Sequence, residues 1–319
     1  MTLKQLRSLC EIVHQGMHLS LAATALHTSQ PGVSRQIHLL EKELDTKIFK
    51  RNRNQILGLT QPGKEILRFT QSVLKSAENI KDVGQEFKNE KTGGLVIATT
   101  YTYARYVLPR VLPRFLRKFP SVRLEFSQGS PQRAVELVES GEADLAVVTN
   151  LVTKPRGVVL VPFGTFHRIV ITPRKHPLLK DRKLTLDAVA KYPIITYGFE
   201  AGGWGRFNHI FESKGLTPNI VFKAVDAELS KKYTELGLGI AIIPHIAYDP
   251  VRDKTVRAID ASDMFGSSTM CIGINREQFL RKYVFEFIVM VAPKLTRAHV
   301  ERAMECPEDT SVSTVVRYG

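Results

Sequence analysis

The sequence predicts an all-α N-terminal domain, then one long helix, then an α/β domain. Three observations carry this prediction. Apolar residues in 20–44 recur at helical spacing around a short polar turn, and residues 62–88 keep a helical apolar pattern with no proline after Pro62. Residues 95–319 alternate short apolar strands with amphipathic helices. At 319 residues, the chain is long enough to bury more than one core.

Residues 20–44 are predicted to form two short helices joined by a tight turn. The first has an apolar stripe of Ala22, Ala23 and Leu26, and it ends near His27. Ser29 suits the N-cap of the second helix, and Pro31 is tolerated in its first turn. The second helix has apolar residues at spacings of four, three and four, namely Val33, Ile37, Leu40 and Leu44. These spacings place one face of that helix on a core.

The opposite face of the second helix presents polar side chains, namely Gln30, Ser34, Arg35 and His38. A glutamine can pair with adenine, an arginine can bind guanine through two hydrogen bonds, and the ring of Pro31 can contact a thymine methyl. Ser34 can serve a base or a phosphate. The pattern therefore indicates a helix-turn-helix whose second helix enters the major groove.

The positive charge of the chain favours a polyanionic partner. The formal net charge is +14, and Lys and Arg outnumber Asp and Glu nine to four in residues 1–64. Four cations crowd into seven positions, namely Lys47, Lys50, Arg51 and Arg53. Such a cluster is often only solvated surface, but beside a recognition helix phosphate contact is the better interpretation.

Four segments, in this order and spacing, resemble the winged helix-turn-helix of LysR-type transcriptional regulators. They are Leu3–Arg7, Ser29–Arg35, Leu44–Arg51 and Leu59–Gly63, which resemble the opening helix, the recognition helix, the wing and the entry to the linker helix. The resemblance implies a DNA-binding domain over residues 1–60. It also implies DNA contacts by Ser29, Gln30, Pro31, Ser34 and Arg35, with Arg51 and Arg53 of the wing on phosphate or in the minor groove.

A linker helix is expected over residues 61–92. Its apolar residues follow a heptad seam with Ser76 at the missing position, namely Ile66, Phe69, Val73, Ile80, Val83 and Phe87. The pattern also fits an ordinary helix packed on its own domain. A single helix-turn-helix reads too few base pairs for genomic specificity, which favours a dimer that presents two such domains. The resemblance implies an antiparallel homodimer through this helix and a homotetramer through the C-terminal domains.

The C-terminal part is predicted to contain mostly parallel strands with helices between them. Strands are expected at 95–99, 122–127, 145–148, 169–172, 194–196, 240–243 and 270–274, and helices at 106–118, 133–140, 186–191, 207–214 and 228–236. The resemblance implies a two-lobed periplasmic-binding-protein-like effector domain over 93–319. Lobe I would take about 93–165 and 267–319 and lobe II about 166–266, with crossovers near 162–166 and 265–268.

Ligands in such folds lie between the lobes, at the carboxyl ends of strands. Three segments should meet there, namely Thr99–Tyr103, Val148–Asn150 and Thr196–Trp204. Their hydroxyl groups and free amides suit a small anion such as sulfate, phosphate or a carboxylate. Threonines at strand ends are also common without any ligand, so both interpretations stay open.

Further segments resemble the CysB/Cbl branch of the LysR family, which regulates sulfur assimilation and the use of alternative sulfur sources. They are Ala98–Tyr106, Gln128–Pro131, Gly141–Asp144 and Phe279–Tyr283. The resemblance implies an effector site at Thr100, Thr102 and Thr149. Two positions depart, because Tyr103 replaces a glutamine and Gly202 a threonine, with Trp204 on the same loop. These departures favour a larger sulfur-containing anion, such as a sulfonate or a sulfated nucleotide, over sulfate.

We therefore expect a regulator that binds double-stranded promoter DNA, a small anionic effector (sulfate or an organosulfur compound) and RNA polymerase. The alternatives are a LysR-type regulator of another pathway sensing another anion, and an α/β enzyme or solute-binding protein. An enzyme is disfavoured because the crevice segments offer only Glu200 as a carboxylate, with no nucleophile and base.

Neither a metal nor another cofactor is expected. The three cysteines have no paired spacing, and Gly16 separates His14 from His18. A solute-binding protein would carry an export signal, and none is recognisable in this sequence. No apolar run approaches about 18 residues, the length that a membrane span needs. We therefore expect a cytoplasmic protein with no membrane partner.

Overall fold

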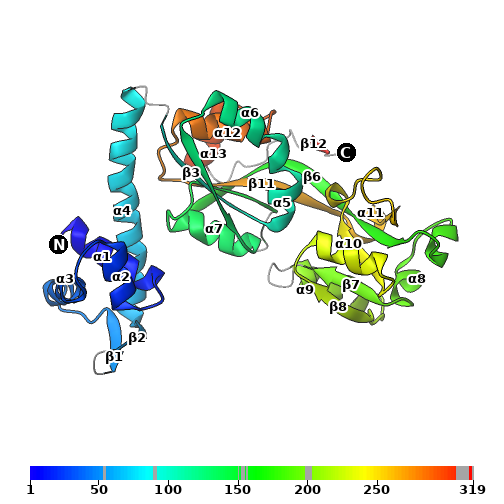
Figure 1. Cartoon of the computed structure of the whole chain (residues 1–319), viewed down its shortest axis with the longest axis horizontal. Coiled ribbons are helices and arrows are strands. Elements are labelled where there is room, and N and C mark those ends of the chain that lie inside the picture. The colour runs from blue at the N-terminus through cyan, green and yellow to red at the C-terminus, as the bar shows by residue number, and fades with distance from the viewer. Residues whose placement is uncertain are drawn as a thin grey trace. The chain divides into compact units, whose positions relative to one another are not determined.

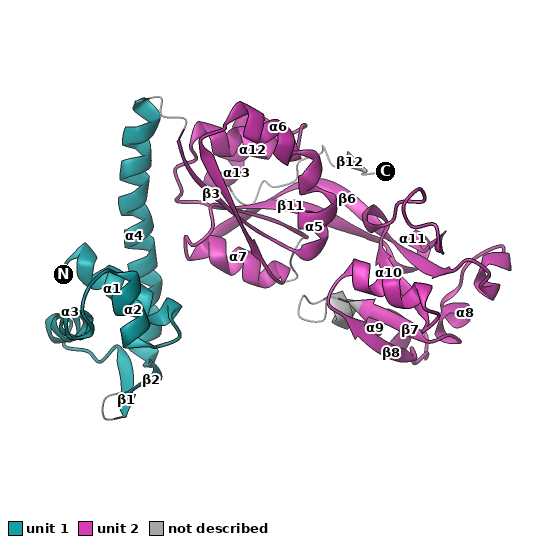
Figure 2. Cartoon of the chain, in the orientation of Figure 1, with its two compact units in different colours: residues 1–90 teal, residues 91–319 magenta. Residues whose placement is uncertain are grey.

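The computed structural model describes residues 1–52, 55–88, 92–149, 151, 155, 157–197, 203–306 and 316–317. The chain forms two compact units, Met1–Glu90 and Lys91–Gly319 (Figure 2). Each unit has hydrophobic clusters of its own. Within the described residues, no helix combines the length and the apolarity that crossing a membrane requires.

The first unit packs three short helices and a two-stranded wing against the start of a long helix (Figure 1). The helices are α1 (Leu3–His14), α2 (Leu19–Ala25) and α3 (Gln30–Glu43). The wing pairs β1 (Phe49–Asn52) with β2 (Gln55–Leu59) in antiparallel fashion. Ser29 caps α3 as predicted, because its hydroxyl oxygen accepts from the amide of Gly32 at 3.2 Å.

The apolar face of α3 is confirmed at three of its four predicted positions. Val33, Ile37 and Leu40 are fully buried. The fourth prediction was wrong, because Leu44 is 38% exposed and follows the last residue of the helix. The helix ends at Glu43 and Leu44 is its C-cap, so Leu44 leaves the buried face.

The long helix α4 (Gln61–Phe87) begins at a capped turn and has two different faces. Its inner face packs Ile66, Leu67 and Leu74 against the core of the first unit. The other predicted seam residues include four exposed ones, namely Phe69 (60%), Val73 (42%), Ile80 (75%) and Phe87 (85%). A helix with this much exposed apolar surface has the character of an interface.

The second unit is a sheet with helices on both faces (Figure 1). The strands are β3 (Gly93–Thr99), β4 (Val122–Gln128), β5 (Leu145–Thr149), β6 (Val158–Pro173), β7 (Ile194–Tyr197), β8 (Ile220–Ala224), β9 (Ile240–Pro244), β10 (Val256–Asp260), β11 (Ser267–Asn275) and β12 (Val316–Arg317). Their order is β4-β3-β5-β11-β6-β9-β7-β8, and β10 and β12 also pair with β6.

Helices divide this unit into two lobes. The first lobe carries α5 (Tyr101–Tyr106), α6 (Leu112–Lys118), α7 (Pro131–Glu139), α12 (Lys282–Val291) and α13 (Arg297–Glu305). The second lobe carries α8 (Leu186–Ala190), α9 (Gly203–Glu212), α10 (Ala227–Glu235) and α11 (Ser262–Phe265). Among the described residues, 3-10 turns lie at Leu108–Arg110, Pro177–Lys180 and His245–Ala247. The predicted fold class, a winged helix-turn-helix followed by a two-lobed α/β domain, is confirmed.

One strand passes through both lobes. β6 pairs with β11 as far as His167; beyond that point it pairs with β9 over residues 168–171 and, on its other edge, with β10 over residues 169–173. Parallel pairs occur within each lobe, whereas the pairs that β6 and β11 make are antiparallel with their main partners. The sheet is therefore less parallel than predicted. The strands that join the lobes, β6 and β11, pair in antiparallel fashion with their neighbours.

Several element predictions need correction. The helix predicted over 106–118 is broken, since α5 ends at Tyr106 and α6 starts at Leu112. Pro109 and Pro113 explain the break, because proline cannot donate the backbone hydrogen bond and clashes with the preceding turn. The sequence reading also missed β8 and β10, whose half-polar pattern is weak, and it recognised only the last part of β6.

Two glycines of α4 should respond oppositely to alanine. A Cβ on Gly63 would lie 2.1 Å from the carbonyl oxygen of Ile48, whereas one on Gly84 would meet nothing within 4 Å. Gly63→Ala should therefore destabilise the joint of wing and helix by roughly 1–3 kcal/mol. Gly84→Ala should stabilise the helix by about 1 kcal/mol or less. Hydrogen exchange of the amides of α3, α4 and the wing measures both effects. Slower exchange around the wing in Gly63→Ala would contradict this packing.

Candidate functional site

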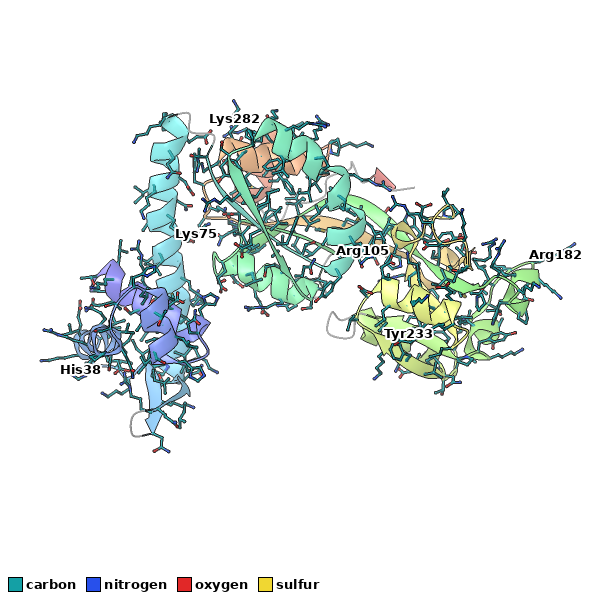
Figure 3. All side chains as sticks on the ribbon, in the orientation of Figure 1. His38, Lys75, Arg105, Arg182, Tyr233 and Lys282 are labelled. Atoms are coloured by element: carbon teal, nitrogen blue, oxygen red, sulfur yellow. The ribbon has the colours of Figure 1, made fainter. Side chains whose placement is uncertain are left out.

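The exposed face of α3 carries the side chains predicted to read DNA. Gln30, Pro31 and Arg35 are exposed, and Ser34 is half-buried. His38 lies on the exposed side of the same helix (Figure 3). Because the buried positions fix the rotation of the helix, these polar groups share the face that is turned away from the core. A recognition helix needs this arrangement.

The turn before α3 fixes where the first residues of this helix lie relative to α2. Its backbone reverses at His27, which has a φ of 48°, and the amide of Thr28 then donates to the carbonyl of Ala23 at 2.9 Å. Ser29 is exposed, and its side chain is engaged in the helix cap. Capping leaves one lone pair and the hydroxyl proton of Ser29 able to contact DNA as well.

Glu41 is a residue that the sequence reading missed. It lies on the buried side of α3 at 5% exposure, and its Oε1 accepts from the amides of Ile48 (2.9 Å) and Phe49 (3.2 Å). These amides begin the wing, so one carboxylate joins the recognition helix to the wing. The available signal was a charged residue at the apolar phase of the helix, four positions after Ile37.

The cations of the wing differ in their exposure, although two of them approach Glu41. The guanidinium of Arg51 approaches Glu41 Oε2 at 3.8 Å, and the ammonium of Lys47 approaches the same oxygen at 4.0 Å. Arg51 is still exposed enough to reach a phosphate, and the Lys47 side chain is 77% exposed. The predicted contact at Arg53 lies outside the described residues.

The sheet topology directs two sets of strand ends toward the junction of the lobes. β3 and β5 run in the same direction as β6, since β11 pairs antiparallel with both β5 and β6. β7 and β9 run in the opposite direction, since β9 is antiparallel to β6 and parallel to β7. The carboxyl ends of β3 and β5 therefore point toward the second lobe, and that of β7 points toward the first.

The register places these ends close to the crossover of β6. Thr149 pairs with Met270, which pairs with Gly164. On the other side, Ile195 of β7 pairs with Ala241, which pairs with Ile171. The change of partners at His167 falls between these two levels, so the carboxyl ends of β5 and β7 lie at neighbouring levels of β6.

The predicted effector threonines lie at adjacent strand ends of the first lobe. Thr99 is buried, pairs with Val147 across the sheet, and donates its hydroxyl to the Val147 carbonyl at 2.7 Å. Thr100 follows it at the N-cap of α5, and Thr149 ends β5. Thr100, Thr102 and Thr149 are all half-buried. The structure brings Thr100 and Thr149 to one edge of the sheet.

Tyr103 has a different setting from its threonine neighbours. Its side chain is only 1% exposed and belongs to the core cluster of the first lobe, where its ring meets Phe166 edge to face at 6.4 Å. The aromatic ring therefore belongs to the buried core of the first lobe. Gly202 and the side chain of Trp204 lie outside the described residues, and the backbone of Trp204 belongs to the first turn of α9.

Two family models together match most of the chain. The model described as bacterial regulatory helix-turn-helix protein, lysR family, matches residues 3–64, and the LysR substrate binding domain matches residues 88–295. The first match covers α1–α3 and the wing, and the second covers both lobes except α13 and β12.

Individual relatives match along nearly the full length. The chain is 41% identical to the HTH-type transcriptional regulator SsuR of Burkholderia cenocepacia, over 94% of this chain and 97% of that protein. It is 40% identical to the HTH-type transcriptional regulator CysB of the same species, over 96% of this chain and 97% of that protein. The crystal structure of the cofactor-binding domain of the Cbl transcriptional regulator superposes with a TM-score of 0.62 at 35% identity, covering 67% of this chain and 93% of that domain.

Proposed function

The chain belongs to the LysR family of DNA-binding transcriptional regulators, and on that premise we propose that it controls genes of sulfur assimilation or organosulfur utilisation in response to a small anion. It is a regulator and not an enzyme. The observation that carries the proposal is the near-full-length similarity to SsuR and CysB at about 40% identity. The predicted resemblance to the CysB/Cbl branch is confirmed by these relatives.

In the proposed complex with promoter DNA, α3 occupies the major groove. Gln30 pairs with adenine, Arg35 binds guanine, and Pro31 contacts a thymine methyl. Ser29 and Ser34 serve a base or a phosphate. The exposure of this face and the buried positions on the opposite face support the assignment.

Arg51 and Arg53 of the wing are proposed to hold phosphate or to enter the minor groove. Phosphate contacts of this kind fix the register of a protein on the duplex. The bonds of Glu41 to the start of the wing support this role, because they limit how far the wing can move from α3.

The proposed assembly is a homodimer through α4, two of which join through the effector domains into a homotetramer. The four exposed apolar side chains of α4 support pairing along this helix. The corresponding domain division is 1–60 for DNA binding, 61–92 for dimerisation and 93–319 for the effector. Contact with RNA polymerase at the promoter, in the cytoplasm, completes the proposed role.

The effector is proposed to bind at the junction of the lobes. Thr100, Thr102 and Thr149 would donate hydroxyl hydrogen bonds to its charged group, with the loop of Gly202 and Trp204 covering an apolar part and Tyr103 behind it. The strand directions and the half-buried threonines support this location. Because Tyr103 and Gly202 stand where the resemblance to the CysB/Cbl branch implies a glutamine and a threonine, a sulfonate or sulfated nucleotide is favoured over sulfate.

Arg35→Ala tests base reading. It should weaken binding to the specific site by roughly 1–3 kcal/mol and relax the preference at one base pair, with much less effect on random duplex. Gel shifts at one fixed salt concentration measure both affinities. Arg117→Ala, which removes an exposed arginine of the second unit, is the control and should leave both unchanged. Equal losses on specific and random DNA would make Arg35 a phosphate contact.

Ile80→Asp tests the dimer seam. A paired seam would bury the new carboxylate, which costs enough free energy to separate the helices. Sedimentation should then show loss of the dimer, together with loss of operator binding and an effector unit that still folds. Lys81→Asp, at an exposed position a quarter turn away, should keep the dimer. A dimeric Ile80→Asp protein would place the seam elsewhere.

Calorimetric titration tests the effector. Residues 91–319, which form one compact unit, should bind ethanesulfonate or a sulfated nucleotide more tightly than sulfate. Thr100→Ala should weaken the tightest ligand by about tenfold or more, because it removes a hydrogen bond to a charged group. Thr217→Ala, at an exposed loop position, should change nothing. The proposal fails if sulfate binds most tightly or if Thr100→Ala leaves all binding intact.

A further inference from the structure

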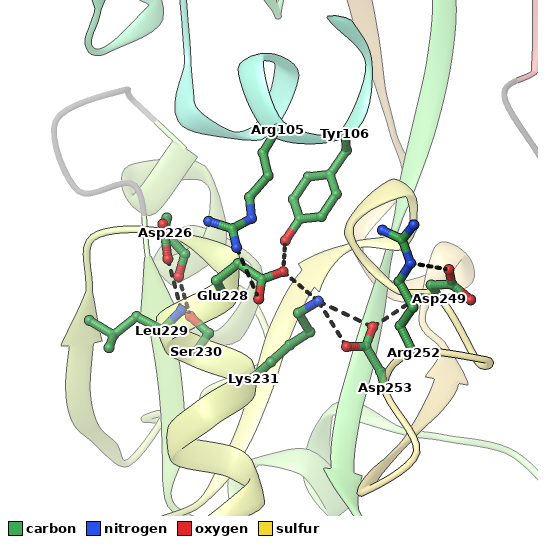
Figure 4. A network of polar contacts seen from close by, with 10 residues as sticks. All are labelled: Arg105, Tyr106, Asp226, Glu228, Leu229, Ser230, Lys231, Asp249, Arg252 and Asp253. Atoms are coloured by element: carbon green, nitrogen blue, oxygen red, sulfur yellow. Dashed lines mark hydrogen bonds and ion pairs between the residues drawn. The ribbon is translucent and has the colours of Figure 1, made fainter. Parts of the chain in front are cut away.

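Two short helices from different lobes meet through side chains that the sequence reading did not single out. Arg105 and Tyr106 end α5 of the first lobe, and Glu228 lies in the first turn of α10 of the second lobe (Figure 4). The phenol of Tyr106 donates to Glu228 Oε1, and the Arg105 guanidinium lies 3.7 Å from Glu228 Oε2. The Glu228 carboxylate thus contacts both side chains across the lobe boundary.

Glu228 is held in place from within its own lobe. The Lys231 ammonium lies 2.6 Å from Glu228 Oε1 and 3.0 Å from Asp253 Oδ1. Lys231 is only 8% exposed, so it needs these partners. The second oxygen of Asp253 accepts from the amide of Asp249 at 2.8 Å. The Glu228 carboxylate, which accepts from Tyr106, is therefore held in position by its own lobe.

The contact also has an apolar part. Tyr106 packs against a hydrophobic cluster of the second lobe that contains Ala227 and Ala241, although its own backbone belongs to the first lobe. The Lys231 ammonium lies 5.5 Å from the centre of the Tyr106 ring. Leaving this position would expose the ring as well as break its hydrogen bond.

The protonation states suit the contact at neutral pH. Burial, and then the hydrogen bond to Glu228, raise the pKa of Tyr106, so its phenol remains a donor. Burial alone would raise the pKa of Glu228, but the hydrogen bonds from Lys231 and Tyr106 and the nearby positive charges outweigh it and lower that pKa. Glu228 therefore stays an ionised acceptor.

We propose that Arg105 and Tyr106 of α5 form a latch with Glu228 and Lys231 of α10, and that this latch sets the angle between the lobes and reports effector binding. The coupling part rests on the proposed function, because Thr100 and Thr102 of the proposed effector site lie at the beginning of α5. The helix has only six residues, so a shift at its first turn reaches the latch within two turns. These are positioning residues and do not touch the effector.

The contact is suited to opening and closing. When Tyr106 and Arg105 leave, Glu228 keeps its ion pair with Lys231, so no unpaired charge is left buried. The lobes remain joined by β6 and β11, which cross the boundary near His167. The latch is therefore a separable contact beside a permanent connection.

Hydrogen exchange of the ligand-free, full-length protein tests the latch itself. Tyr106→Phe and Glu228→Gln should each speed exchange of the amides of α5 and α10 by about tenfold, and the double variant should add little to either. Glu235→Gln, which removes a carboxylate of α10 whose ion pair among the described residues is with Lys232 of the same helix, is the matched control and should leave exchange unchanged. Unchanged exchange in both single variants, or fully additive effects, would overturn the latch.

The coupling is tested with ethanesulfonate. In the natural protein, this anion should change operator affinity in gel shifts. In Tyr106→Phe, it should still bind by calorimetry within about threefold but no longer change operator affinity. A normal response of Tyr106→Phe would overturn the coupling. If ethanesulfonate, sulfate and the sulfated nucleotide all fail to bind the natural protein, the proposed function and the coupling fail together, while the exchange experiment still decides the latch.

Discussion

The passage of β6 through both lobes is the constraint on which the effector half depends. Its sixteen residues continue from the first lobe into the second, and the pairing partner changes between His167 and Arg168. Because backbone hydrogen bonds fix strand direction, β5 and β7 must run toward each other on the two sides of this change. The convergence of their carboxyl ends is thus a consequence of topology. The threonines occupy a junction that exists whether or not they bind an anion.

The DNA-binding half depends on a different kind of link. Apolar burial fixes the rotation of α3, but it does not fix the wing, which is a hairpin with few core residues. The carboxylate of Glu41 supplies that link by accepting two amides at the start of β1. It also approaches Arg51, so a cation of the wing is oriented by the same group. The two elements that are proposed to contact DNA, α3 and the wing, are therefore linked by one buried side chain.

Features that depend on local apolar spacing were predicted from the sequence, whereas contacts between residues far apart in the chain were missed. The N-cap of α3 follows from the residue type of Ser29, and the buried face of α3, the length of α4 and most strands of the two lobes follow from apolar spacings of three, four or two. Leu44 and the broken helix after Tyr106 were misjudged where helix ends and prolines compete with apolar spacing. The latch could not be foreseen, because Tyr106 and Glu228 are 122 residues apart and neither pattern requires the other.

The strength of the latch bears on whether the effector half can act as a switch. A ligand shifts an equilibrium between two states only by the difference in its affinity for them. Typical coupling free energies are about 1–3 kcal/mol, and a hydrogen bond to a charged group contributes a similar roughly 1.5–3 kcal/mol. A contact such as that of Tyr106 with Glu228 is therefore strong enough to favour one lobe angle and weak enough for one bound anion to override. One bound anion could not override a fully buried ion pair across the boundary, because separating that pair leaves charges unpaired. By keeping Lys231 on the same lobe as Glu228, the structure avoids that cost.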